Sequence, residues 1–366
     1  MQFELREQTP IALLISVPII AVLCSLAIAS FFIIWAGQSP IEGFALILKG
    51  AFGSSFALTE TLAKTIPLIF TGLAAAIAFR AKFWNIGAEG QLYCGALAAT
   101  WLGTGLVDLP PMLMIPFLII VGMLAGAAIL MLPVFLKNKL NVDEVVTTLL
   151  LNFVILLFVG YCIEGPFKDP MSMGWPQAEP IIDSGVFPQL VERSRLHIGL
   201  IFALIAALVC WIIFRFTLWG FEIRALGMNP NAARHAGIKP HWTILKVALL
   251  SGGLAGLAGV SEVAGLKGYL TLDLSPGFGY TGIAVAMLAN LHPLGVVLSA
   301  LFLASIFVGA DFMGRTIGVP NFIADIMVAV SVLAILIGLF LCKYKIKFSR
   351  ASQASIQQAA TKQGAA

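Results

Sequence analysis

The chain has 366 residues, of which 60% are hydrophobic and only 11% are charged, and its mean hydropathy is +0.98. A soluble protein carries about 25% charged residues, so this composition excludes a water-soluble globular fold. The net charge of +4 is typical of the loop bias that orients membrane proteins and carries no indication of nucleic acid. Several apolar stretches can each cross about 30 Å of hydrocarbon, which predicts an all-α membrane protein.

The first apolar run extends from Ile11 to Trp35 and follows a short polar segment. The run is longer than the core of a signal peptide, although Ala27-Ile28-Ala29 resembles a cleavage site. The residues before it are not positively charged, since Arg6 is outnumbered by Glu4 and Glu7. We interpret the run as an uncleaved first span.

The hydropathy pattern predicts ten transmembrane spans within one membrane domain, residues 1–348. The predicted spans are Ile11–Trp35, Leu62–Phe79, Gly87–Gly105, Met112–Leu136, Val145–Cys162, His197–Phe216, Thr243–Leu266, Gly277–Leu291, Pro293–Ala310 and Pro320–Cys342. With the N-terminus in the cytoplasm, fifteen of the 22 Lys and Arg residues fall inside. The seven outside are Lys49, Lys64, Lys168, Arg193, Arg195, Lys267 and Arg315. This excess predicts that both termini are cytoplasmic.

Two segments outside the spans differ in character. The extracytoplasmic loop at residues 163–196 carries five acidic and three basic residues, five prolines, and the aromatic residues Trp175 and Phe187. A loop of this length is usually functional or disordered, so a docking surface for an external partner and a structured lid over the path both remain open. The tail at residues 349–366 is rich in Ala, Gln and Ser, and this composition predicts disorder.

Spans two to five and seven to ten indicate an inverted repeat. Small residues recur at Thr71–Ala75 in one half and Gly252–Gly256 in the other. Each half continues into a Gly-interrupted turn, Asn85–Gly90 or Ser275–Gly279, and then a short span. Because the second span enters the membrane from the opposite side to the seventh, the halves would be inverted. Short broken segments at matching places in two halves indicate a binding site near the membrane midplane.

The segment Trp219–Ile238 is polar and basic although it lies between two long apolar spans. It contains Arg224 and Arg234 against one acid, Glu222, and its composition is compatible with a helix. A segment this polar must lie in water or against another protein. We interpret it as a short cytoplasmic helix that contacts a partner, with a solvated connecting loop as the alternative.

The sequence contains no catalytic constellation and no G-x-x-x-x-G-K-[ST] motif for ATP phosphates. The five cysteines are unclustered, which favours neither a disulfide framework nor a metal site. The histidines are scattered and lack metal-ligand spacing; they are His197, His235, His241 and His292. We therefore expect no enzyme activity, no metal and no cofactor of this chain's own.

The predicted spans contain few ionisable residues, and these lie near span ends at Glu89, Glu262 and Asp325. Intramembrane charges mark function more often than charges in soluble proteins, but interfacial placement explains these three. A path this poor in charge favours a neutral polar solute and an external source of energy.

Amide side chains can contact such a solute without the desolvation cost of a charge. Asn290 is a less specific candidate because it can instead complete the turn before His292 and Pro293. The predicted pathway residues are Asn85, Glu89, Gln91, Asn152 and Asn290.

Three motifs carry a family resemblance over nearly the whole chain: Phe83–Gln91 (FWNIGAEGQ), Asn141–Asn152 (NVDEVVTTLLLN) and Gly227–Ala233 (GMNPNAA) with Gly237 and Ile238. Together they resemble the permease subunit of a bacterial ABC importer, in the nucleoside and simple-sugar branch of the branched-chain amino acid permease superfamily. The third motif is shared by relatives that carry branched-chain amino acids. Met173–Gln177 in the outer loop resembles the longer permease of a nucleoside-type pair.

The resemblance implies that residues 219–238 form the coupling helix, which sits in a groove of a separate ATPase subunit that binds ATP. Arg224 and Arg234 would then meet acidic residues of that groove. It also implies a second permease, identical or homologous, an extracytoplasmic binding protein and an inner-membrane location. The residues that match the family pattern are Gly227, Asn229, Ala232, Ala233 and Gly237.

We therefore predict a permease subunit of an ATP-driven importer for a nucleoside or simple sugar. One alternative is an ABC permease for another polar solute such as a branched-chain amino acid, although no clear midplane charge meets a zwitterion. A second is an ion-coupled secondary carrier, which needs acids near the midplane. An intramembrane enzyme comes third, and no nucleophile pair supports it.

Overall fold

The computed structural model describes residues 2–5, 11–318 and 344–347, with scattered single positions and pairs between 322 and 338. Most of the tenth predicted span, Asp325 and the predicted tail at 349–366 lie outside these described residues. The chain divides into two compact units, one of residues 1–40 and 325–366 and one of residues 41–324. The first unit holds α1 (Ile11–Trp35) and an antiparallel pair of strands, β1 (Gln2–Leu5) and β2 (Tyr344–Lys347).

The second unit is helical and contains the candidate site. Its helices are α2 (Pro40–Phe52), α3 (Ser55–Arg80), α4 (Ala88–Gly103), α5 (Pro111–Leu140), α6 (Glu144–Glu164), α7 (Gly199–Phe216), α8 (Leu218–Met228), α9 (Pro230–His235), α10 (Pro240–Val260), the 3-10 turn η1 (Asp183–Gly185), the π-helix η2 (Ser261–Lys267), α11 (Phe278–Leu288) and α12 (Pro293–Ile317).

Helices lie at the positions of the first nine predicted spans, so the all-α membrane class is confirmed. Among the described residues, six helices are long and apolar enough to cross a membrane, and the broken pair Leu26–Trp35 and Pro40–Phe52 is a seventh candidate. Two predicted spans are shorter helices: α4 has 16 residues and α11 has 11. At 1.5 Å per residue they reach only about 24 and about 16 Å, less than the thickness of the hydrocarbon core.

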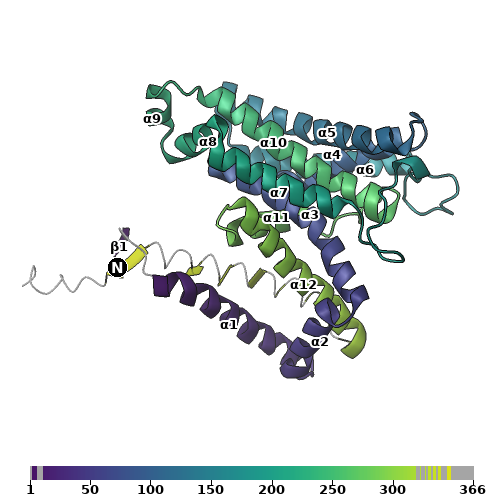
Figure 1. Ribbon diagram of the computed structural model, residues 1–366, viewed down its shortest axis with the longest axis horizontal. Coiled ribbons are helices and arrows are strands. Elements are labelled where there is room, and N and C mark those ends of the chain that lie inside the picture. Colours follow the sequence, from purple (N-terminus) through teal and green to yellow (C-terminus); the bar gives the residue numbers. More distant parts are fainter. Residues whose placement is uncertain are drawn as a thin grey trace, which may run out of the picture. The chain divides into compact units, whose positions relative to one another are not determined.

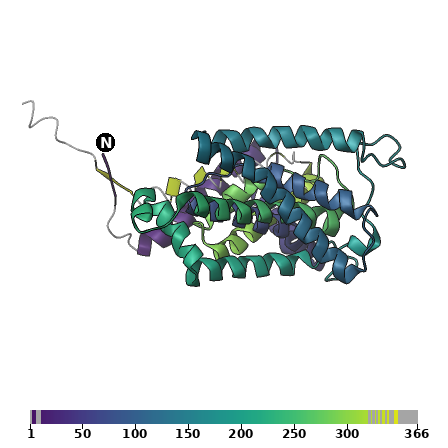
Figure 2. The same ribbon diagram turned by 90° about the horizontal axis from the view of Figure 1, so that it is seen from above.

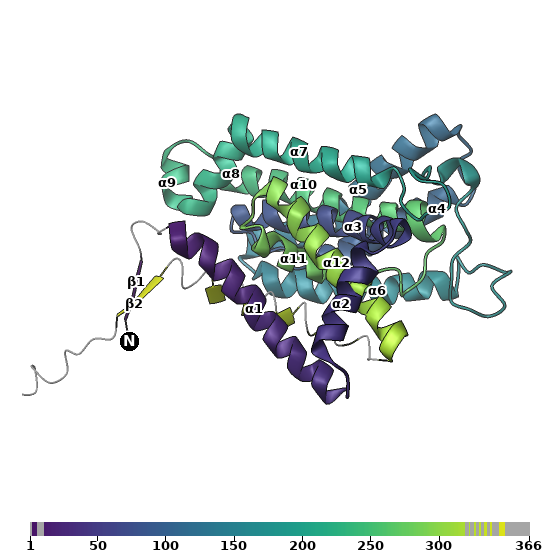
Figure 3. The same cartoon turned by 60° about the horizontal axis from the view of Figure 1, so that its bottom comes forward.

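Helix α2 was not predicted, because its residues were taken as part of an outer loop. The sequence nevertheless carries helix signals, since Pro40 occupies the first helical position, Glu42 lies in the first turn and Lys49 in the last. The helix packs on α12, where a side chain at Gly309 would overlap Ile47 (Figure 3).

The antiparallel helices α3 and α10 form the centre of the second unit, and α3 is almost wholly buried. Ser251 Oγ on α10 donates to the carbonyl of Ala74 on α3 at 2.8 Å. Close approach to α5 depends on glycine, because a Cβ at Gly252 or Gly256 would overlap the backbone around Gly126 or Gly122. Small residues at such contacts allow backbones to meet, and packing explains these glycines.

The two ends of the helical unit differ. Helices α8 and α9 lie together at one end, and the long loop between α6 and α7 lies at the other (Figures 1 and 2). The cytoplasmic segment and the outer loop predicted from the sequence therefore belong to opposite ends of this unit.

Candidate functional site

The short helices α4 and α11 begin in the same way. Before α4, Asn85 Oδ1 accepts the N–H of Gly87 at 2.9 Å. Before α11, Ser275 Oγ accepts the N–H of Gly277 at 3.2 Å and that of Phe278 at 2.8 Å. In both cases a polar side chain satisfies N–H groups that have no partner within the helix.

The N-terminal turns of these two helices meet. Glu89 Oε2 on α4 accepts the backbone N–H of Gly279 on α11 at 2.6 Å. A side chain at Gly279 would overlap the backbone of Glu89, so this approach requires glycine. Glu89 is only 3% exposed, and its carboxyl group therefore belongs to the junction of the two helices.

A cluster of amides ties this junction to the central helices. Asn85 Nδ2 donates to Gln91 Oε1 and to Ser251 Oγ, both at 3.0 Å. Gln91 Nε2 donates back to Asn85 Oδ1 at 2.9 Å. Both amide side chains are buried and hydrogen-bonded, which matches the rule for buried polar groups.

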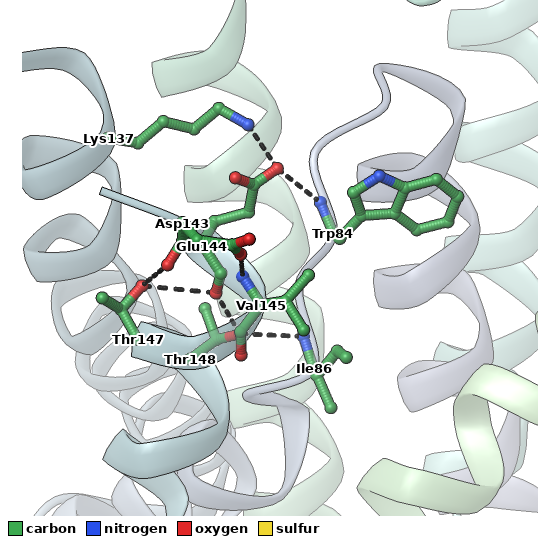
Figure 4. Close-up of polar contacts among 8 residues, drawn as sticks. All are labelled: Trp84, Ile86, Lys137, Asp143, Glu144, Val145, Thr147 and Thr148. Atoms are coloured by element: carbon green, nitrogen blue, oxygen red, sulfur yellow. Dashed lines mark hydrogen bonds and ion pairs between the residues drawn. The ribbon is translucent and has the colours of Figure 1, made fainter. Parts of the chain in front are cut away.

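Helix α6 holds the irregular segment before α4 through a row of three side chains, Glu144, Thr148 and Asn152, which we call the α6 ladder (Figure 4 shows its first two). Their spacing of four places them on one helix face. Glu144 Oε1 accepts the N–H of Trp84 at 3.3 Å and forms an ion pair with Lys137 of α5. Thr148 Oγ1 accepts the N–H of Ile86 at 3.1 Å.

Asn152 completes the ladder and reaches both short helices. Its Oδ1 accepts the N–H of Gly90 at 2.9 Å, and its Nδ2 donates to the carbonyl of Ile86 at 3.0 Å and to Tyr280 Oη of α11 at 3.1 Å. Irregular backbone inside a membrane protein needs such partners because lipid supplies none. The ladder therefore brings together two of the three motifs noted in the sequence.

The loop before α11 is fixed by α4. Tyr93 Oη donates to the carbonyl of Leu272 at 2.5 Å and accepts the N–H of Ser275 at 3.2 Å. In the same loop Asp273 lies 3.3 Å from Lys267. The pKa of Asp273 is lowered, chiefly by a hydrogen bond from Thr271 and further by the Lys267 ammonium.

Four of the five predicted pathway residues lie together at this junction: Asn85, Glu89, Gln91 and Asn152. Asn290 lies apart from them, exposed and in the left-handed region with φ 49°, in the turn between α11 and α12. The prediction missed Thr148, Tyr93 and Tyr280. The four-residue spacing of the ladder could have identified Thr148. Nothing in the sequence indicated what either tyrosine contacts.

The predicted coupling segment is two helices rather than one. Helix α8 ends at Met228, and α9 starts at Pro230. Asn229 lies between them in an extended conformation, and its Oδ1 accepts the N–H groups of Asn231 and Ala232 at 3.0 and 3.1 Å. The prediction of a single helix is wrong because the residue before a proline avoids helical geometry and Asn229 caps a new helix.

The residues of this segment divide into an inward and an outward set. Gly227 lies against the carbonyl of Arg80, the last residue of α3, and Ala233 is 3% exposed. Arg224 donates to the carbonyl of Phe214. Gly227 and Ala233 are therefore buried within the chain and Arg224 is hydrogen-bonded to it, while their role in coupling to an ATPase stays a prediction. The exposed residues from Met228 onward, which we call the α9 surface, are Met228, Asn229, Pro230, Asn231, Ala232, Arg234, His235, Ala236 and Gly237.

These features define a polytopic helical membrane protein, with two short helices meeting inside the bundle and a pair of short polar helices at one end. Residues 57–341 match the family described as the permease component of branched-chain amino acid transport systems. The chain belongs to this family.

Relatives of nearly the same length are permease proteins of ABC transporters. The chain is 36% identical over 319 residues to the guanosine ABC transporter permease protein NupP of Bacillus subtilis, covering 87% of this chain and 91% of the relative. It is 34% identical to the nucleoside ABC transporter permease protein NupB of Lactococcus lactis, covering 86% and 88%. It is 32% identical to the glucose ABC transporter permease protein TsgB13 of Haloferax volcanii, covering 94% and 93%.

The predicted resemblance is therefore confirmed, and the chain is a permease subunit of an ABC transporter. Its relatives are transport subunits rather than enzymes. The predicted location, a multi-pass protein of the inner membrane, is that of this family, and the apolar helices agree with it. A secondary carrier with its own ion coupling is not favoured.

Proposed function

We propose that this chain forms, with a second permease, the path for a nucleoside or simple sugar in an ATP-driven importer. The observation that carries the proposal is the junction of α4 and α11, where the side chains beside Glu89 are neutral amides and hydroxyls such as Asn152 and Tyr280. Such groups suit sugar hydroxyls and nucleobase edges. The named solutes of the relatives, guanosine, nucleosides and glucose, support this class over branched-chain amino acids.

We further propose the inverted repeat and place the path near its centre. Helix α10 packs against α4 and α5 as α3 packs against α11 and α12. The two helix starts align residue by residue, with Asn85, Gly87 and Glu89 corresponding to Ser275, Gly277 and Gly279. Discontinuous helices at matching places mark solute sites in other transporters. Ten spans with both termini in the cytoplasm complete this proposal.

The ATPase would act through α8 and α9. The α9 surface is free to enter a groove of the partner, with Arg234 as its charge. Helix α8 reaches both central helices, since Gly227 lies against the end of α3 and Glu222 pairs with Lys246 of α10 at 3.3 Å. A displacement of α8 would therefore move α3 and α10 together. ATP is bound and hydrolysed by the partner, and this chain needs no cofactor of its own.

The outer loop at residues 163–196 would receive the extracytoplasmic binding protein. The loop is held against the segment after α10, with Ala178 N–H bonded to the Leu270 carbonyl at 2.9 Å and Phe187 N–H to the Ala264 carbonyl at 2.8 Å. At its tip, Met171, Met173 and Trp175 are 86%, 98% and 73% exposed. Exposed apolar groups on an ordered segment favour a docking surface.

Reconstitution tests the proposal. The chain would be placed in proteoliposomes with its partner permease and ATPase, the binding protein added outside, and uptake of radiolabelled guanosine, uridine, glucose and leucine measured. We expect accumulation of a nucleoside or glucose that requires ATP inside the vesicles. Accumulation by the chain alone under an ion gradient, or of leucine only, would contradict the proposal.

A further inference from the structure

The N-terminal turns of α4 and α11 converge on one carboxyl group. Glu89 lies in the first turn of α4, and its Oε2 accepts the N–H of Gly279 in the first turn of α11 at 2.6 Å. Ser275 Oγ accepts the N–H of Phe278 at the same helix start, at 2.8 Å. The Glu89 side chain therefore lies at the start of its own helix and is hydrogen-bonded at the start of the other.

Helix N-termini attract anions, because their free N–H groups and the helix dipole both favour negative charge. In transporters built from discontinuous helices, these ends contact the anionic group of the solute, such as the carboxylate of an amino acid. Here the corresponding place is filled by a side chain of the protein that is 97% buried, since Glu89 is only 3% exposed. The chain thus supplies its own anion where an anionic solute would otherwise bind.

We infer that Glu89 is a specificity-determining residue that excludes anionic and zwitterionic solutes from the path. Its carboxylate occupies the helix starts and repels a second negative group, while Asn152, Tyr280 and the amide cluster remain as neutral contacts. The transported class would be uncharged polar molecules, so nucleosides and sugars would be accepted and their phosphate esters rejected. This inference rests on the proposed function, because it assumes that the solute passes this junction.

Removing the Glu89 carboxylate tests whether it occupies a site that would otherwise bind an anion. Glu89→Ala, in the full chain in nanodiscs, would expose both helix starts to formate, the carboxylate fragment that the mutation removes. We expect sodium formate to raise the thermal unfolding midpoint of this variant saturably, by about 2–4 °C, relative to sodium chloride at equal ionic strength. Wild type should show no such rise.

Controls separate this effect from general stabilisation. Thr100→Ala removes a buried neutral side chain from the same helix α4, one that bonds the carbonyl of Ala96 far from either helix start, and it should not respond to formate. Glu89→Ser also removes the carboxylate, and its hydroxyl suits the start of a helix, so it provides a second variant with the same site opened to formate. Equal responses in wild type and both opened variants, or none in the opened variants, would overturn the inference.

Glu89→Gln keeps the side-chain volume and provides a measurement if the opened variants do not fold. In complete transporters that take up guanosine, guanosine 5′-monophosphate trapped inside the vesicles should inhibit this variant at about fivefold lower concentration than wild type. Unchanged inhibition would count against the inference. Since the formate measurement uses the chain alone, its failure is distinguishable from failure of the transport assay.

Discussion

Gly227 of α8 packs directly on the backbone carbonyl of Arg80, the last residue of α3, and any side chain at position 227 would overlap that oxygen. The Arg80 guanidinium in turn lies 4.7 Å from the centre of the Phe214 ring at the end of α7. The polar helix α8 therefore packs directly against the end of the central helix α3. The contact is rigid because it joins backbone to backbone.

Gly227→Ala should break this contact and uncouple the transporter. The added methyl group pushes α8 away from α3, so we expect ATP-dependent uptake to fall about tenfold or more while the chain still inserts in the membrane. Uptake and ATP hydrolysis in proteoliposomes would measure the uncoupling. Gly318→Asn is the matched control, since position 318, after α12 and outside the coupling segment, has φ +71° and open space around it, and Asn tolerates that conformation. Uptake by Gly227→Ala equal to that of the control would refute the role of this contact.

The two arginines of the coupling segment should behave differently. Arg234 is exposed on the α9 surface, so Arg234→Glu should reduce co-purification of the ATPase without lowering the thermal unfolding midpoint. Arg224 instead donates to the carbonyl of Phe214, so Arg224→Gln should lower stability by about 1–2 kcal/mol, and ATPase binding would change less. Pull-down and thermal unfolding of both variants measure the contrast. The same loss of ATPase binding in both variants would argue against two roles.

Thr148→Val should destabilise the chain, whereas Thr147→Val should not. Valine has the shape of threonine, but at position 148 it leaves the half-buried N–H of Ile86 without its acceptor, at a cost of about 1–2 kcal/mol. Thr147 bonds only carbonyls of its own segment, Asp143 and Glu144, so its replacement should change stability by less than about 0.5 kcal/mol. Unfolding in a denaturing detergent compares the stability of the two variants. Equal losses of stability would show that the hydrogen bond from Ile86 to Thr148 contributes nothing.

Asn152→Ala should impair both stability and uptake. It leaves the N–H of Gly90 and the carbonyl of Ile86 without their side-chain partner and removes the bond to Tyr280, which together cost about 2–5 kcal/mol. We expect the ATPase to remain associated, because the α9 surface is untouched. Uptake kinetics and co-purification provide the test.

Asn290→Gly provides the control for Asn152→Ala. Asn290 is exposed with φ 49°, a conformation that glycine adopts freely, so uptake and stability should stay at wild-type values. Loss of uptake in Asn290→Gly would support a pathway role for Asn290. Normal uptake in Asn152→Ala would contradict a pathway role for Asn152.

Several features followed from local sequence because their causes are local. The long apolar runs predicted most of the helices, and the polar composition of Trp219–Ile238 predicted a separate segment at the end of the unit. The break at Asn229 and Pro230 was also readable, since capping and proline geometry act over a few residues, yet the prediction of one helix overlooked it. Helix α2 was also missed, although Pro40 in its first turn and Lys49 in its last turn are local helix signals of the same kind.

The amino-acid sequence by itself thus determined the membrane class, the family and the residues of the polar motifs, because composition and spacing act along the chain. Only the tertiary structure decided which groups those residues meet. Glu89 and Gly279 are 190 positions apart, and their contact exists because two helix starts converge and glycine lets them touch. The same folding turned Gly227 inward, since backbone packing against α3 depends on where α8 lies and not on its composition.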